Sequence, residues 1–119
     1  MQILIALMAI SSAASAQGIA QKGIEVPNAI IKQHNNYVRC QDEHFDIRSV
    51  RDEQSFIAEV EKAITACKDQ KAALTQEAET ILASTPDYRD PGKRQDAIAQ
   101  SFDGYDQMRR EMARGGHTK

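Results

Sequence analysis

The chain has 119 residues, and its 15 Lys and Arg against 17 Asp and Glu give a formal net charge of −2. This near-neutral balance argues against a dedicated nucleic-acid-binding protein, because such proteins carry a strong basic excess that matches the phosphate backbone. Trp is absent and aromatic residues make up 5% of the chain, which also disfavours recognition by base stacking.

The first residues have the pattern of a cleavable secretory signal, which we place at 1–16. They begin with an almost unbroken apolar run and end in Ser-Ser-Ala-Ala-Ser-Ala. Ala14 and Ala16 occupy the two positions that signal peptidase requires to be small, so cleavage is expected between Ala16 and Gln17. The n-region lacks the usual Lys or Arg, which leaves an upstream start as an alternative. An N-terminal core helix is a second alternative, which the poor helix stop Ser-Ser-Ala-Ala-Ser disfavours. The run is far shorter than the roughly 20 residues that cross a bilayer, which disfavours an uncleaved membrane anchor. We expect no stable membrane span after signal cleavage.

Cleavage would leave about 100 residues, enough for one domain with a modest core. A flexible lead-in is expected over 17–27, because this segment contains two Gly and shows no clear apolar period. Pro27 then suits the first turn of a helix. We predict the first helix at 28–46, where apolar and aromatic residues recur with a helical period: Ile30, Ile31, Tyr37, Val38 and Phe45.

The clearest periodic segment predicts one long central helix over about 52–83. Its apolar residues are spaced by alternating steps of three and four, which places them in a narrow seam on one face: Ile57, Val60, Ile64, Cys67, Leu74, Ala78 and Ile81. Lys71 interrupts this seam. The preceding segment, 46–52, is mostly charged and reads as a connection, with Ser49 as a candidate cap.

Two Pro and one Gly within 85–92 must end the central helix. A third helix is predicted over 93–114, with Gly115 and the Gly after it as the stop and 115–119 as a flexible tail. Three helices with short connections favour an all-α fold with a three-helix up-down-up arrangement in one domain, 28–114. The third helix places five apolar or aromatic residues on one face: Ile98, Phe102, Tyr105, Met108 and Met112.

The chain has two cysteines, Cys40 and Cys67, and export would place them in an oxidising compartment where thiols pair. We therefore predict a Cys40–Cys67 disulfide. Its Cα atoms must come within about 7 Å, so the first helix must pack along the first half of the central helix. Closing this loop would stabilise the fold by roughly 3 kcal/mol in the chain-entropy description.

The same cysteines offer a metal site as an alternative. Cys40 and His44 share a helix face, Cys67 joins them if the two helices pair, and His34 is a candidate fourth ligand. Zinc requires thiolates, however, and neither a second Cys-x-x-Cys nor a His-x-x-x-His clamp supports such a site. We therefore assign no metal-binding and no cofactor-binding residue.

Two acidic pairs are the candidates for general acid–base catalysis: Asp42-Glu43 and Asp52-Glu53. Both pairs lie in segments that read as solvated faces or helix starts, where carboxylates are favoured by the helix dipole. We assign no catalytic residue and expect a protein that is not an enzyme.

Other sequence motifs of known function give no assignment either. No Gly-rich phosphate loop, nucleophile elbow or haem-attachment motif is present in the sequence, and 103–106 is too short for a calcium loop. The basic stretch 109–114 suits an anionic membrane or partner, but a solvated helix end explains it equally well.

Two short segments carry a resemblance. Residues 37–40 read Tyr-Val-Arg-Cys and residues 63–67 read Ala-Ile-Thr-Ala-Cys. This Tyr-x-x-Cys and Ala-x-x-x-Cys pattern resembles one in small exported helical proteins of Gram-negative, especially alphaproteobacterial, bacteria, for which no activity is known. A more remote likeness is to periplasmic acid-stress chaperones, which are also small, helical, exported and held by one disulfide. Here the cysteine spacing is shorter and the third helix is additional.

We therefore expect a periplasmic or secreted helical protein that works by contact with another protein or with a second copy of itself, and not with nucleic acid. The long central helix motivates this expectation, because its apolar seam extends beyond what the short first helix covers. An acid- or stress-related envelope chaperone is the alternative, and a metal-binding protein is the second alternative.

Overall fold

The computed structural model describes residues 24–115, which contain helices and no strand. The all-α prediction is confirmed. The predicted signal at 1–16, its cleavage between Ala16 and Gln17 and the tail beyond Gly115 lie outside the described residues. In chain order the elements are η1 (Asn28–Ile30), α2 (Ile31–His44), η2 (Ile47–Ser49), α3 (Glu53–Ala66), α4 (Lys68–Ala83), η3 (Pro86–Tyr88) and α5 (Pro91–Ala113), where η denotes a 3-10 helix.

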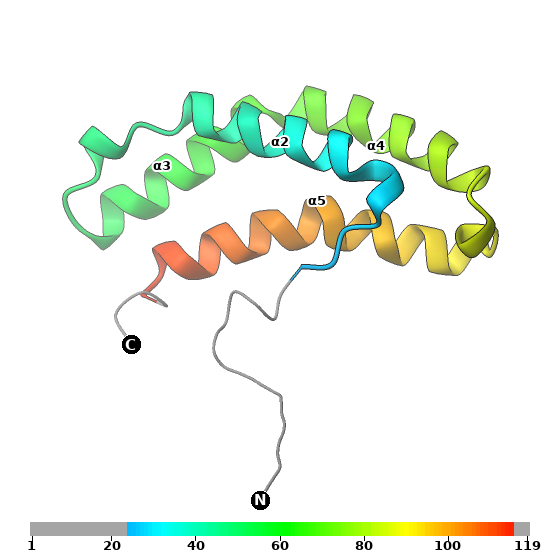
Figure 1. Cartoon of the computed structure of the whole chain (residues 1–119). Helices are drawn as coiled ribbons and strands as arrows, with labels where there is room; N and C mark the ends of the chain where they lie inside the picture. The colour runs from blue at the N-terminus through cyan, green and yellow to red at the C-terminus, as the bar shows by residue number, and fades with distance from the viewer. Residues whose placement is uncertain (1–23, 116–119) are drawn as a thin grey trace, which may run out of the picture.

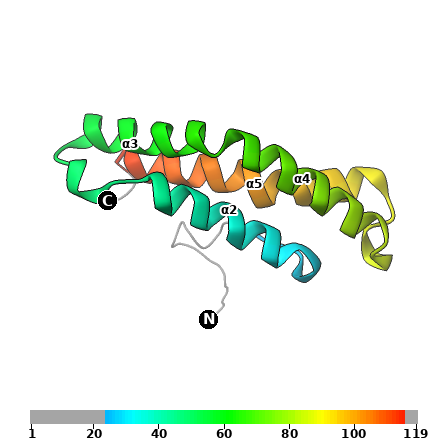
Figure 2. The same cartoon turned by 90° about the horizontal axis from the view of Figure 1, so that it is seen from above.

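The helices lie side by side in an elongated arrangement. In Figure 1, α3 and α4 together run back along α2, and α5 returns along them. Figure 2 shows α2 alongside the bent pair formed by α3 and α4. Within 24–115, no helix is both long and apolar enough to span a bilayer.

The predicted single central helix is two helices, because the backbone departs from helical geometry at Cys67 (φ −99°, ψ 10°). Hydrogen bonding nevertheless continues through this junction. The Cys67 amide donates to the Ala63 carbonyl oxygen at 3.1 Å, and the Lys71 amide donates to the Cys67 carbonyl oxygen at 2.8 Å. Neither Pro nor Gly marks the junction, and the apolar spacing continues across it, so the sequence pattern could not reveal the break.

Side-chain caps fix the start of α3. The Asp52 carboxylate accepts from the Ser55 amide at 2.9 Å, and the Ser55 hydroxyl accepts from the Asp52 amide at 3.1 Å, which forms a capping box. Ser49, the cap candidate, lies inside η2 instead. Its hydroxyl donates to Asp46, whose carboxylate caps η2, so the prediction for Ser49 is wrong.

Helix α5 has local signals at both of its ends. Pro91 occupies its first turn, and the Asp90 carboxylate accepts from the Lys93 amide at 2.9 Å. Gly115 follows the helix with φ 104°, a conformation that only Gly adopts without strain. The predicted helix end at this Gly agrees with the structure.

A core drawn from all the long helices fills the space between them. Tyr37 of α2 packs edge-on against Phe102 of α5, with ring centroids 5.6 Å apart. Ile24 and Val26, which belong to the predicted lead-in, also pack against this core. The most buried apolar side chains are Ile30, Tyr37, Val60, Ala63, Cys67, Ala78, Leu82, Phe102 and Ala113.

The apolar seam of α3 and α4 is covered from within the chain. Of its residues, Leu74 is 5% exposed and Ala78 is fully buried, and both belong to one cluster with Ile98 of α5. Helix α5 contacts both α3 and α4. The length of the central segment therefore does not by itself call for a partner.

The disulfide joins α2 to the α3–α4 junction. Cys40 and Cys67 are bonded, with Cα atoms 6.1 Å apart, as predicted. Cys67 is fully buried and Cys40 is 6% exposed, so the bond lies inside the helical packing.

Candidate functional site

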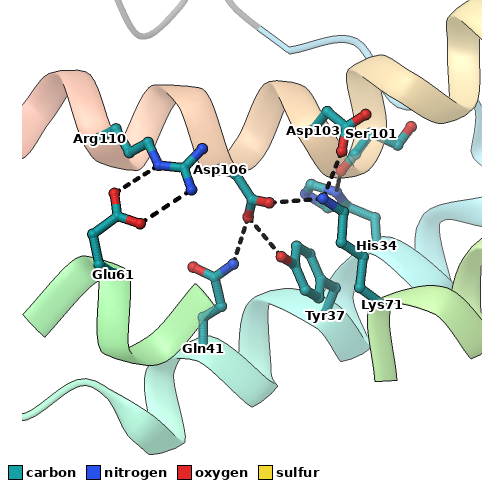
Figure 3. Close-up of polar contacts among 9 residues, drawn as sticks. All are labelled: His34, Tyr37, Gln41, Glu61, Lys71, Ser101, Asp103, Asp106 and Arg110. Atoms are coloured by element: carbon teal, nitrogen blue, oxygen red, sulfur yellow. Dashed lines mark hydrogen bonds and ion pairs between the residues drawn. The ribbon is translucent and has the colours of Figure 1, made fainter. Parts of the chain in front are cut away.

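A buried carboxylate, Asp106 of α5, is the centre of a polar network that connects three helices (Figure 3). Asp106 is only 3% exposed. Its Oδ1 accepts from the Tyr37 hydroxyl at 2.6 Å and from Gln41 Nε2 at 2.7 Å. Its Oδ2 accepts from Lys71 Nζ at 2.9 Å. One side chain of α5 is thus bound to α2 and α4 at once.

Helical spacing places these groups. Tyr37 and Gln41 are one turn apart on α2 and so face α5 together. Asp103 and Asp106 are likewise one turn apart, and Lys71 pairs with both. Lys71, which interrupts the apolar seam in the sequence, is tolerated there because two carboxylates compensate its charge.

The network keeps its donors protonated. Burial raises the pKa of the Tyr37 hydroxyl above its ordinary value, and the hydrogen bond to Asp106 and the negative charge of Asp106 raise it further. Burial alone would lower the pKa of Lys71, but hydrogen bonds to Asp103 and Asp106, with their charges, outweigh it and the pKa is raised. Both side chains therefore remain donors throughout the neutral range.

The hydrogen bonds of this network are made within the protein. Both oxygens of Asp106 already accept hydrogen bonds from the protein, and Tyr37 is fully buried. The Tyr37 hydroxyl is thus shielded from solvent, whereas Asp106, although engaged within the fold, also lines the cleft described below. Losing Asp106 would leave Tyr37 and Gln41 without their acceptor in a dry environment, so the network holds the helices in register.

Next to the network, a cleft of about 370 Å³ lies between α5 and the junction of α3 and α4. Arg110 is held at its edge by Glu61 of α3, through contacts of 2.7 and 3.1 Å. Lys68 is exposed, and its ammonium group makes no hydrogen bond or ion pair with any residue of 24–115. The lining residues are Ile64, Thr65, Lys68, Lys71, Asp103, Asp106, Gln107 and Arg110.

The structure brings together three of the four residues of the metal alternative. Ligand atoms of Cys40, His44 and Cys67 all lie within 4.8 Å of one another, although the two sulfurs are joined as a disulfide and are not thiolates. His34 lies elsewhere. Its Nδ1 donates to the Ser101 carbonyl oxygen at 2.8 Å.

One carboxylate of each acidic pair is engaged within the fold. Asp42 accepts from Arg109 at 3.3 Å, and Asp52 is committed to the α3 cap. In the basic stretch 109–114, Arg109 also lies 5.0 Å from the Phe45 ring centroid, and Arg110 pairs with Glu61. Two of the cations expected to face a membrane or partner are thus engaged within the fold.

No protein-family model, curated protein or solved structure matches this chain. The resemblance to small exported helical proteins therefore stays a prediction, as does the periplasmic or secreted location.

Proposed function

We propose that this protein is an exported helical protein that acts in the periplasm or outside the cell by binding another protein, and not by catalysis. The Cys40–Cys67 disulfide supports export, because such bonds persist in oxidising compartments and are rare in the cytosol. The Asp106 network favours binding over catalysis, because both Asp106 oxygens already accept hydrogen bonds from side chains of the protein.

The observation that carries this proposal is Lys68. It lines the cleft together with Arg110 and Lys71, and it is the member of these three whose charge is not paired within 24–115. A carboxylate of a partner protein would complete this pairing. One exposed ion pair contributes only about 0.2–1 kcal/mol, so an acidic partner segment must also contact Thr65 and Gln107 in the cleft.

Affinity capture from the native envelope tests the proposal, with the disulfide-bonded protein as bait. We expect one partner that is retained at low salt and released as salt rises. Lys68→Glu should lose it. Lys32→Glu, at another exposed lysine that lies on α2 outside the cleft, should keep it. Equal capture by both variants, or a protein that stays monomeric and captures nothing, would overturn the proposal.

An acid-activated chaperone is a second candidate, favoured by the Glu61–Arg110 pair that joins α3 to α5. The hydrogen bond from Arg110 lowers the pKa of Glu61. Protonation in acid would break this bond and loosen the packing over the apolar seam. Circular dichroism and suppression of client aggregation should then differ between pH 3 and pH 7. Identical behaviour at the two pH values would contradict it.

A further inference from the structure

An imidazole lies beside the disulfide. His44 Nδ1 is 3.8 Å from Cys67 Sγ, and Cys40 lies one helical turn before His44 on α2. Cys67 comes from a different element, the junction of α3 and α4. Three atoms that can ligate a metal are therefore gathered by two separately anchored segments.

Their spacing suits a tetrahedral metal ion. Zinc binds sulfur at about 2.3 Å and imidazole nitrogen at about 2.0–2.1 Å, so tetrahedral ligands are separated by about 3.6 Å for a sulfur–nitrogen pair and about 3.8 Å for two sulfurs. The distance from His44 Nδ1 to Cys67 Sγ is already close to the first value. With the Cα atoms of the two cysteines 6.1 Å apart, rotation of their side chains can bring separated sulfurs to the second value.

We propose that reduction of the disulfide turns this cluster into a Zn²⁺ site, with the Cys40 and Cys67 thiolates and the His44 imidazole as ligands and one position left for water or an external ligand. The proposal goes beyond the protein-binding function. The reductant is a dithiol, which supplies two electrons and two protons and itself becomes a disulfide. Zn²⁺ binding then releases the two thiol protons, so the charges balance.

The environment of His44 allows this change. In the disulfide form, His44 Nδ1 donates to the Cys40 carbonyl oxygen at 3.0 Å. Coordination through Nδ1 requires the tautomer that carries its proton on Nε2, so this hydrogen bond is exchanged for the metal bond. His44 is exposed, whereas the cysteines are buried. The ion therefore enters from the histidine side, and the thiolates are sheltered from solvent.

Spectroscopic titration with Co²⁺, a probe for zinc sites, tests the proposal under anaerobic conditions. The protein is reduced with a phosphine, which does not compete for the metal as a dithiol does. We expect the reduced protein to bind one Co²⁺ with thiolate-to-cobalt absorption, and one equivalent of Zn²⁺ to remove it. The disulfide form should show no such absorption. His44→Gln should weaken Zn²⁺ binding at least about tenfold, whereas His34→Gln should leave it unchanged.

Two results would overturn the site. One is the absence of thiolate-to-cobalt absorption in reduced protein that circular dichroism shows to be folded. The other is equal Zn²⁺ affinity of His44→Gln and wild type. If reduction unfolds the protein, Zn²⁺ should restore its helical signal, because metal binding then drives folding. Failure to restore that signal would contradict the proposal as well.

Discussion

Two neighbouring sets of side chains hold α2 against the rest of the molecule by different chemistry. Cys40 forms a covalent bond to the α3–α4 junction, while Tyr37 and Gln41 on either side of it hydrogen-bond to Asp106 of α5. The covalent bond restricts the unfolded chain. The hydrogen bonds exist only in the folded state, and each depends on the others being made. The disulfide anchor is therefore sensitive to reductant, and the Asp106 anchor is sensitive to pH and to substitution.

Removal of Asp106 should have the largest effect. Asp106→Ala leaves Tyr37 and Gln41 without their acceptor and Lys71 with only Asp103, so we expect a loss of about 3 kcal/mol in the free energy of unfolding. Urea denaturation measures it. Asp103→Asn serves as a control, because Asp103 is exposed and its loss should change stability by less than about 1 kcal/mol. Similar small effects of both substitutions would show that the network does not hold the helices.

Loss of the disulfide should have the second-largest effect on stability. The bridge spans a sequence separation of 27, so the double variant Cys40→Ser and Cys67→Ser should lose roughly 3 kcal/mol while keeping its helices at neutral pH. Urea denaturation and circular dichroism check both parts. Stability equal to that of the wild type would mean that the Asp106 anchor suffices to hold α2.

Tyr37→Phe should have a smaller effect, because it removes one donor to Asp106 and keeps the aromatic packing against Phe102. We expect a loss of about 2 kcal/mol, as for one hydrogen bond to a charged group. The same denaturation assay measures it. Phe102→Leu changes the aromatic packing but removes no hydrogen bond. It therefore separates the packing contribution of Tyr37 from its hydrogen-bond contribution.

Alkaline pH should weaken the Asp106 anchor selectively. The pKa of Tyr37 is raised from its ordinary value of 10.0, so the folded state keeps the proton while the unfolded state loses it. Its contribution is fully present below pH 10 and declines as pH rises further; Lys71, whose pKa is also raised, acts in the same direction above pH 10.5. Urea midpoints between pH 8 and pH 11 should fall less steeply in Tyr37→Phe than in the wild type. The double Cys→Ser variant should keep the wild-type slope, and equal slopes in all three proteins would remove this distinction between the anchors.

The smallest effect is expected for Glu61→Gln, which touches neither anchor. Glu61 is 41% exposed, so losing its pair with Arg110 should change stability at pH 7 by at most about 1 kcal/mol. The pKa of Glu61 is lowered from 4.5, so its contribution is present above that pH and is lost as pH falls through the folded-state pKa. The variant should therefore lose less stability than the wild type between pH 5 and pH 3 in thermal unfolding. An identical acid profile would show that this pair does not govern acid loosening.

Local patterns in the sequence predicted the helical segments and most of their limits, but not the break at Cys67. The apolar period located α2, the α3–α4 segment and α5 within a few residues, because one buried face requires regular spacing. The two Pro near 85–92 and Gly115 placed the connection and the stop correctly. The disulfide followed from two cysteines and an expected export signal, since one pairing was possible.

Only the tertiary structure determined which polar groups meet. Lys71 was visible in the sequence as an interruption of the seam, but its partner Asp106 lies 35 residues away on another helix. Asp106 belongs to 103–106, the segment that is too short for a calcium loop. No local pattern indicates that its side chain is buried. The sequence also could not show three further features. These are the break at Cys67, the separation of His34 from His44, and the packing of α5 over the apolar seam. Periodicity specifies which face of a helix is buried, whereas the partners on that face depend on how distant helices pack.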